Sequence, residues 1–255
     1  MRRLMTVVMV VSLLVSGGRS AEALVWGGFD STRVNYSTGV LSGSAHNTLR
    51  GYITAAGDTV GPLTGTITSA YLSTIDVFYT SLLTNNGVPL TAAEQSALQA
   101  WIAGGGTLVV TADIFNIPGY ESFTSFYGVT GFTDSGSGTG TVVDNTHPIT
   151  VGVTSIGYVT VDRFTYGSDA RLLANNANGQ PFIVVLDGTS GFAQAGRIVV
   201  FGDHNMFTES YIGNSDNQLL AQNLVAWVGL PQLCGNGVWD AGEQCDDGNT
   251  TPGDG

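Results

Sequence analysis

The chain has 255 residues, 43% of them hydrophobic, a length that supports one sizeable core rather than two ordinary domains with a linker. It carries 20 acidic residues against 8 basic ones, all of them arginine, for a formal net charge of −12 at pH 7. Such a surface repels phosphate backbones and anionic lipids, so nucleic acid and acidic membranes are poor candidates for a partner.

The first 23 residues have the pattern of an export signal. Arg2 and Arg3 form a positively charged start, residues 4–15 are apolar, and residues 21–23 read Ala-Glu-Ala, a small-residue cleavage site. A membrane anchor is the alternative, but it needs about 20 apolar residues, and this run is broken at Ser16. We therefore expect residues 1–23 to be a signal peptide and the mature chain, beginning near Leu24, to be secreted or displayed at the cell surface without a transmembrane segment.

Strand and helix patterns alternate along the first half of the chain. Residues 24–26 predict a short strand, and apolar residues at helical spacing predict a helix between residues 45 and 56, which Gly57 ends. A weaker strand at 59–63 and a brief helix at 69–73 follow. Residues 76–81 are apolar and aromatic, which is typical of a strand buried on both faces.

The best-marked helix follows Thr91. Thr91 and Glu94 match the S/T-x-x-E capping box, apolar residues between 97 and 102 share one face, and Gly104 to Gly106 end the helix. Residues 107–111, Thr-Leu-Val-Val-Thr, then predict a second central strand.

The second half has weaker patterns. Residues 120–127 predict a helix, and residues 131–141 are so rich in Gly, Ser and Thr that they predict a loop or an edge hairpin. Strands are expected at 170–174, 182–186 and 198–201, and a final helix from about Asp216 to Val228. The interleaving predicts an α/β fold: a three-layer, mostly parallel, flavodoxin-like sheet with helices on both faces and some antiparallel hairpins in the second half.

Ligands of such sheets bind at the carboxyl ends of the strands. Asp113 follows one central strand, and Asp203, His204 and Asn205 follow another. These four residues are the candidate pocket, with two readings open: Asp113 caps the next turn and His204 lies on the surface, or Asp113, Asp203 and His204 line one pocket. No two histidines have a metal-ligand spacing, so we expect no zinc site in this part of the chain.

Three segments carry a resemblance to a known superfamily. The first segment is the helix after Thr91 with its three glycines and TLVVTAD at 107–113. The second is THPIT-x-GV at 146–153, and the third is GRIVVFGDHNMF at 196–207. Their order resembles the class I glutamine amidotransferase-like superfamily, closest to its non-amidotransferase branches, such as trehalose-utilisation-like proteins and domains of gliding-motility and intraflagellar-transport proteins. The resemblance covers residues 24–230.

The resemblance implies an amidotransferase-like domain without its catalytic cysteine. Catalytic members place a cysteine nucleophile after the strand that follows the glycines, and a histidine and a glutamate after a later strand. Here Ala112 or Asp113 falls at the nucleophile position, and His204, with Glu209 further on, falls near the histidine position. This departure removes thioester chemistry and leaves no catalytic residue assigned. For His147 the resemblance implies a structural role in the turn.

The last residues, 231–255, carry a second resemblance. CGNGVWDAGEQCDDGN and the final Gly-Asp-Gly look like the opening of a cysteine-rich repeat common in secreted proteins of myxobacteria and their relatives. That repeat continues with further cysteines, so we expect an incomplete repeat and a fragment. The resemblance implies a disulfide between Cys234 and Cys245. Oxygen ligands for calcium, or else solvated turns, are expected at Asp246, Asp247, Asn249 and Asp254.

Three functions fit these observations. The leading one is an exported non-catalytic binding or scaffold protein with a protein or carbohydrate ligand and no cofactor, unless calcium binds the tail. The second is an exported hydrolase of a carbohydrate or related small molecule, with Asp113, Asp203 or His204 in acid–base roles. The third is a calcium-dependent surface adhesion component.

Overall fold

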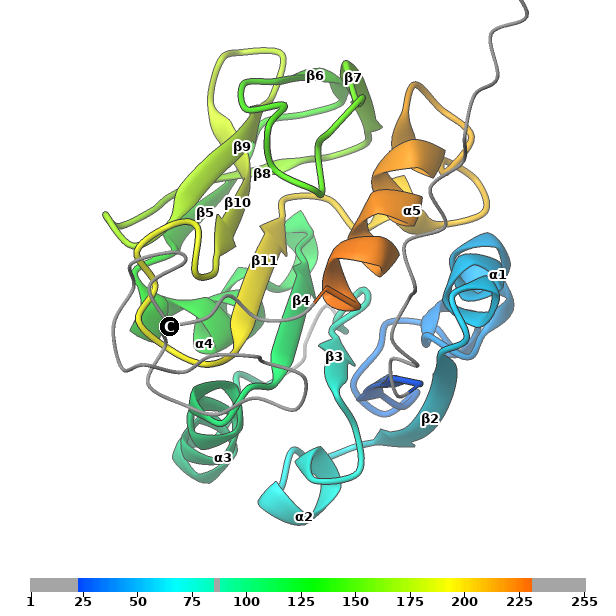
Figure 1. Ribbon diagram of the computed structural model, residues 1–255, viewed down its shortest axis with the longest axis vertical. Helices are drawn as coiled ribbons and strands as arrows, with labels where there is room; N and C mark the ends of the chain where they lie inside the picture. Colours follow the sequence, from blue (N-terminus) through cyan, green and yellow to red (C-terminus); the bar gives the residue numbers. More distant parts are fainter. Residues whose placement is uncertain (1–22, 85–87, 231–255) are drawn as a thin grey trace, which may run out of the picture.

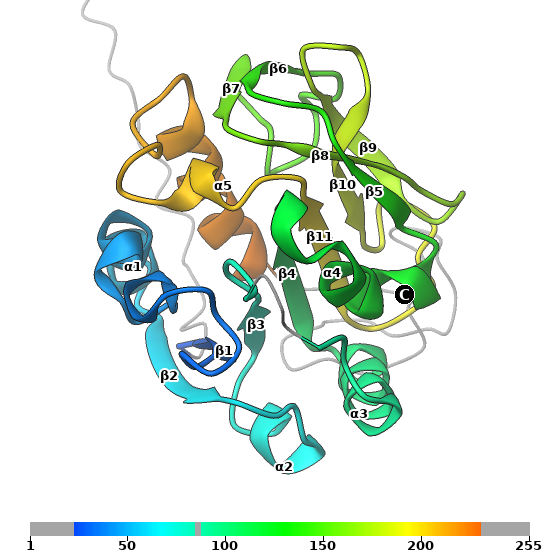
Figure 2. The same cartoon turned by 180° about the vertical axis from the view of Figure 1, so that it is seen from behind.

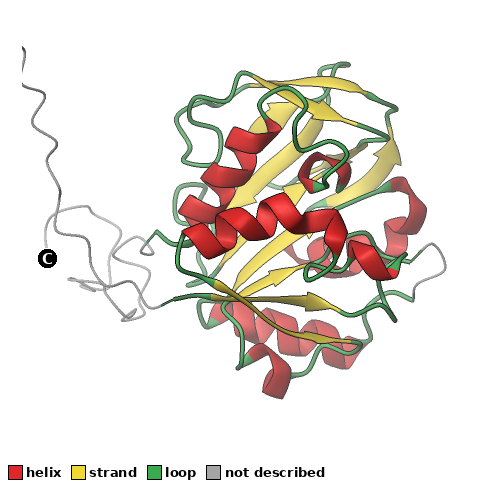
Figure 3. Ribbon diagram, turned by 90° about the vertical axis from the view of Figure 1, so that its right-hand side faces the viewer, coloured by secondary structure: helices red, strands yellow, loops and turns green. Residues whose placement is uncertain are grey.

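A nine-stranded sheet with helices on both faces forms the centre of the molecule (Figure 1, Figure 3). The computed structural model describes residues 23–84 and 88–230. The predicted signal peptide, except Ala23, and the cysteine-rich tail with Cys234, Cys245 and its acidic residues lie outside these residues. The helices are α1 (Asn47–Ala55), α2 (Ser69–Leu72), α3 (Ala92–Ala103), α4 (Ile117–Thr124) and α5 (Asn217–Val228).

The sheet has the strand order β2-β1-β3-β4-β11-β10-β9-β6-β7. From β2 to β11 neighbouring strands are parallel, and from β11 to β7 they are antiparallel. The predicted α/β fold is therefore confirmed, and its antiparallel part is the second half of the chain. The strands of this sheet are β1 (Val25–Phe29), β2 (Thr59–Thr64), β3 (Val77–Tyr79), β4 (Thr107–Thr111), β6 (Gly138–Val142), β7 (Ser155–Tyr158), β9 (Arg171–Asn175), β10 (Pro181–Leu186) and β11 (Arg197–Phe201).

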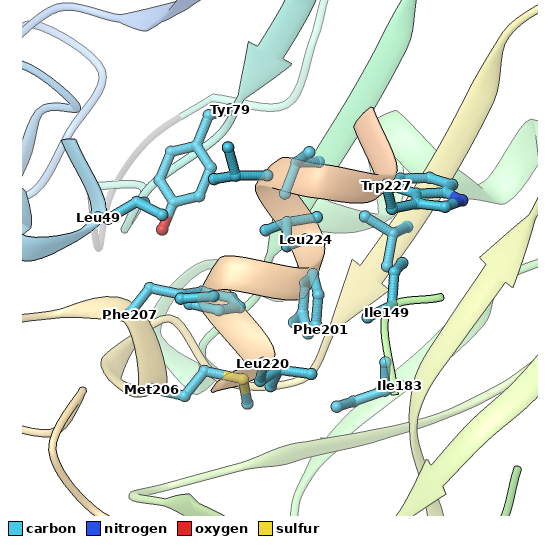
Figure 4. Packing of buried hydrophobic residues seen from close by; sticks show 14 of the residues in the cluster. Leu49, Tyr79, Ile149, Ile183, Phe201, Met206, Phe207, Leu220, Leu224 and Trp227 are labelled. Carbon is cyan, nitrogen blue, oxygen red and sulfur yellow. The ribbon is translucent and has the colours of Figure 1, made fainter. Parts of the chain in front are cut away.

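Two apolar cores hold the helices against the sheet. Helices α1 and α5 cover one face, and α2, α3 and α4 cover the other, as the opposite views of Figure 1 and Figure 2 show. Alternate residues of the central strands enter different cores, since Val109 belongs to the first and Val110 to the second. Figure 4 shows the first core, where Leu224 and Trp227 of α5 pack near Phe201 of β11. Burial on both faces explains the continuous apolar runs of these strands.

The start of α3 is built as its sequence predicts. The Thr91 hydroxyl accepts a hydrogen bond from the Glu94 amide, and the Glu94 carboxylate accepts one from the Thr91 amide at 2.9 Å. Glu94 also pairs with Arg33 at 3.3 Å and accepts from the Ile67 amide at 3.1 Å. The capping residue therefore also joins α3 to two neighbouring loops.

The glycine-rich segment 131–141 is not a loop or a hairpin. It contributes β5 (Thr130–Asp134), which pairs with β8 (Asp162–Thr165) in a separate two-stranded sheet, and β6, which pairs with β7 and β9. The glycines serve close packing: a Cβ on Gly140 would lie 2.6 Å from the Phe182 ring, and one on Gly138 would lie 2.8 Å from the Tyr158 hydroxyl. Strands β7 and β8 have no clear sequence pattern and were not predicted.

Gly202, directly after β11, leaves room for β8 to approach the main sheet. We predict that position 202 tolerates no side chain. The amide of Asp162 donates to the Gly202 carbonyl at 2.7 Å, and a Cβ on Gly202 would lie 2.1 Å from the Asp162 carbonyl oxygen. Gly202→Ala should lower the free energy of unfolding by about 1–3 kcal/mol, measured by denaturant titration. The control is Gly213→Ala, where a Cβ meets nothing within 4 Å. Equal stability of the two variants would contradict this account.

Candidate functional site

The pairing of β4 with β11 brings two loops together at the carboxyl edge of the sheet. Thr111, the last residue of β4, is in register with Phe201, the last of β11, and the next amide, that of Ala112, donates to the Phe201 carbonyl at 2.8 Å. Figure 1 shows the two strands side by side with the same direction. Asp113 and His204 therefore leave the sheet as neighbours.

Asp113 and His204 form a buried hydrogen-bonded pair. The Nδ1 atom of His204 donates to Oδ2 of Asp113 at 2.9 Å, and the two residues are 4% and 1% exposed. The interpretation of His204 as a surface residue was wrong. The capping interpretation of Asp113 was also wrong, because its side chain makes no capping hydrogen bond to the short 3₁₀ turn that follows it. Its second oxygen, Oδ1, has no partner among the described residues.

Asp203 is fixed beside this pair by main-chain and amide donors. Its Oδ2 accepts from the Val159 amide at 2.7 Å, and its Oδ1 accepts from the amide and the side chain of Asn205 at 2.9 and 3.0 Å. Burial raises the pKa of Asp203 to about 6, although these donors and His204 act in the opposite direction. The four residues of the candidate pocket thus lie together, with Asn205 contacting Asp203.

Three of these residues could hold a metal ion. Asp113, Asp203 and His204 each offer one ligand atom, and these atoms lie within 4.8 Å of one another. Oδ1 of Asp203 is 3.9 Å from Nδ1 of His204. The expectation against a metal site considered only the spacing of histidines along the chain. That spacing contains no information about ligands that follow two different strands and meet only in the folded sheet.

Asp162 is a fourth member of the site, and the sequence analysis missed it. It is fully buried at the start of β8, and neither carboxylate oxygen has a hydrogen-bond partner among the described residues. Burial, with the nearby carboxylates of Asp113, Asp134 and Asp203, raises the pKa of Asp162 to about 8. A signal existed: Asp162 shares one face of β8 with the buried Phe164, so an acid occupies an apolar position of the alternating pattern.

His46 lies under the site, next to Tyr79. The Tyr79 hydroxyl donates to Nε2 of His46 at 3.4 Å, and Nδ1 lies 3.3 Å from the Val40 carbonyl oxygen. Burial, together with the electrostatic effect of the nearby His204, lowers the pKa of His46 to about 4, so the ring is neutral at pH 7. Burial also raises the pKa of Tyr79 well above its usual value. This hydroxyl therefore keeps its proton and is not an activated nucleophile.

The other predicted residues do not join the cluster. Ala112, at the nucleophile position, is buried and apolar, and both cysteines of the chain lie outside the described residues. Glu209 binds the Thr48 amide and hydroxyl at the start of α1. His147 accepts from the Ile149 amide and donates to Asp187 at 3.0 Å, so it holds its turn in a separate histidine–aspartate pair.

The buried Asp162 should make stability fall as pH rises. Its pKa is 3.8 when unfolded and about 8 when folded, so between these values the folded protein retains a proton that the unfolded chain has lost, and the free energy of unfolding decreases with pH. Asp162→Asn removes this titration. Relative to wild type, the variant should gain stability steadily from pH 4 to pH 8 in denaturant titrations with EDTA, which keeps cations from neutralising the carboxylates. The control is Asp169→Asn, whose side chain is exposed, and a pH-independent difference for Asp162→Asn would contradict the assignment.

Solved structures similar to this chain share its fold. The N-terminal domain of mmIFT52 aligns with a TM-score of 0.62 and 13% identity over 82% of this chain and 98% of that one. A ThuA-like protein from Parabacteroides merdae aligns with 0.52 and 13% over 82% and 90%. A glutamine amido transferase from Methylobacillus Flagellatus aligns with 0.52 and 10% over 84% and 97%. At these identities the likeness concerns the fold alone, and it agrees with the predicted amidotransferase-like superfamily.

The sequence comparisons add a family. No curated protein matches the chain. The profile described as "Domain of unknown function (DUF4350)" matches residues 50–225, a range that runs from within α1 to within α5 and contains all of the candidate site except His46. The chain belongs to the DUF4350 family.

Proposed function

We propose that this protein is an exported, non-catalytic α/β domain that binds a ligand at the carboxyl edge of its sheet. The observation that carries the proposal is the burial of the titratable groups at this edge: Asp113, Asp162, Asp203 and His204 all lie beneath the surface, and Ala112 stands at the nucleophile position. A substrate must touch the groups that transform it. Here Asp113 and Asp203 contact His204 instead.

A hydrolase is the alternative, and one observation favours it. Asp113 and His204 converge at 2.9 Å, which acid–base catalysis at this edge would require. The burial of the pair weighs against it, because a substrate would have to reach side chains that are only 4% and 1% exposed. We therefore assign the pair a role inside the fold.

Two exposed aromatic rings offer a binding surface beside this cluster. Phe115 is 49% exposed and lies in the 3₁₀ turn directly after Asp113, and Tyr36 is 38% exposed. Burial and the Asp113 carboxylate raise the pKa of Tyr36. Because Asp113 influences it electrostatically, we infer that the Tyr36 hydroxyl lies near the same edge of the sheet. Exposed aromatic rings supply the flat apolar faces on which sugar rings and apolar side chains pack. We take carbohydrate as the ligand class to test first.

The amino-terminal contacts support export. The amide of Leu24, the first residue after the proposed cleavage site, donates to Oδ1 of Asp58 at 3.0 Å, and Oδ2 of Asp58 accepts from the Trp26 indole at 3.1 Å. Cleavage before Leu24 would convert that amide into an ammonium group next to a carboxylate, a favourable pair. Between residues 23 and 230, apart from 85–87, no helix is long and apolar enough to cross a bilayer.

The binding proposal predicts retention of a carbohydrate without its cleavage. The protein is incubated with soluble oligosaccharides from bacterial and plant cell walls, and bound and free fractions are analysed by mass spectrometry. Every oligosaccharide should remain intact, and those retained should bind at least about tenfold more weakly to Tyr36→Ala/Phe115→Ala, a loss of about 1.4 kcal/mol. Phe126→Ala is the control, because this ring is exposed on a different turn.

Two outcomes would contradict the proposal. Cleavage of an oligosaccharide that disappears in a folded Asp113→Asn variant would establish a hydrolase. Absence of any retained oligosaccharide would remove carbohydrate as the ligand.

Export predicts a defined amino terminus. Chain recovered from outside the producing cells should begin at or within a residue or two of Leu24, because the signal is removed there, and intact-mass spectrometry with amino-terminal sequencing measures this. A control carrying Ala21→Arg and Ala23→Arg blocks the small-residue site and should keep the precursor mass. Recovery of the wild-type chain with residues 1–23 attached would rule the signal out.

A further inference from the structure

The cluster at the carboxyl edge holds more buried carboxyl oxygens than its protein partners satisfy. Within the described residues, the ion pairs of Asp113 and Asp203 are made with His204 alone. Asp113 Oδ1 and both oxygens of Asp162 have no hydrogen-bond partner there, and all of these residues are buried. Buried carboxylates are paired, protonated or bound to a metal. One imidazole cannot satisfy three of them.

The arrangement of the donor atoms suits a small ion. Around a zinc-like ion with ligands at about 2.0–2.2 Å, neighbouring ligand atoms lie about 3–3.6 Å apart. Nδ1 of His204 is 2.9 Å from Oδ2 of Asp113 and 3.9 Å from Oδ1 of Asp203, so shifts of under about 1 Å would place these ligand atoms around one centre. The carboxyl of Asp162, which Asp113 and Asp203 both influence electrostatically, is also buried without a hydrogen-bond partner among the described residues.

The surroundings of the cluster fix its ligands. The Val159 amide and both nitrogens of Asn205 hold the Asp203 carboxylate, and the register of β4 with β11 holds Asp113 opposite His204. Such outer contacts orient metal ligands and tune their affinity. The three ligand residues are at most 4% exposed, so a bound ion would be out of reach of a substrate, unlike a catalytic metal with its accessible open position.

We propose that Asp113, Asp203 and His204 bind one divalent transition-metal ion, of the Zn²⁺ or Mn²⁺ class, that ties the loop after β4 to the loop after β11. The donor set selects the class: imidazole suits transition metals, whereas calcium takes six to eight oxygens and magnesium keeps several waters. The ion stabilises the fold and reacts with nothing. This site is separate from the tail residues predicted to bind calcium, and it does not depend on what the edge aromatics bind.

The test compares the full chain with matched variants. Protein stripped with EDTA is titrated with ZnCl₂, MnCl₂, CaCl₂ or MgCl₂, and bound metal per chain, affinity and melting temperature are measured. A parallel series of the same proteins carries Cys234→Ser and Cys245→Ser, so that the thiols of the tail cannot act as zinc ligands. Wild type should bind one Zn²⁺ or Mn²⁺ per chain and melt at a higher temperature when loaded. Asp113→Asn and His204→Gln should each weaken binding about 100-fold or more, since loss of even an outer contact costs about 10–100-fold.

Asp187→Asn is the matched control, because it also breaks a buried histidine–aspartate contact, that of His147. It should lower the melting temperature yet keep the metal stoichiometry and affinity. Three results would each overturn the proposed site. The first is no binding of Zn²⁺ or Mn²⁺ at millimolar concentration, which would leave a shared proton as the only cation of the cluster. The second is unchanged binding in Asp113→Asn and His204→Gln, and the third is an equal loss of affinity in Asp187→Asn.

Discussion

The register between β4 and β11 is the constraint on which the site depends. The two strands end together, at Thr111 and Phe201, and Ala112, the residue after β4, continues the contact by donating to the Phe201 carbonyl. Two features of the cluster follow from this alignment: the 2.9 Å contact of Asp113 with His204 and the nearby position of Asp203. Slipping either strand by one residue would move these side chains to the opposite face of the sheet.

The parallel part of the fold could be predicted from the sequence because its signals are local. The capping box at Thr91 and the glycines after residue 103 mark α3, and continuous apolar runs mark the buried strands. The antiparallel part depends on contacts between distant residues. Gly140 lies in a strand because it must pass Phe182, and no window of neighbouring residues contains that information.

The positions of the site residues could also be predicted from the sequence, but their burial could not. Asp113, Asp203, His204 and Asn205 follow predicted strands, so the rule for ligand positions in α/β sheets identified them. Whether these side chains are buried or exposed could not be predicted, because that depends on which segments cover this edge of the sheet. Asp162 comes from a strand that the sequence did not indicate, whereas His46 lies at the start of the predicted helix between residues 45 and 56; nothing local in either segment indicates that both side chains are fully buried.

The span of the contact between Asp113 and His204 has a consequence for folding. The two residues are 91 positions apart, and Asp162 approaches them only where Gly202 leaves room for its backbone. Closing loops of this length is entropically costly, and contacts of high sequence separation slow folding. The carboxylates can therefore leave water only after β4 and β11, from opposite halves of the polypeptide, have paired.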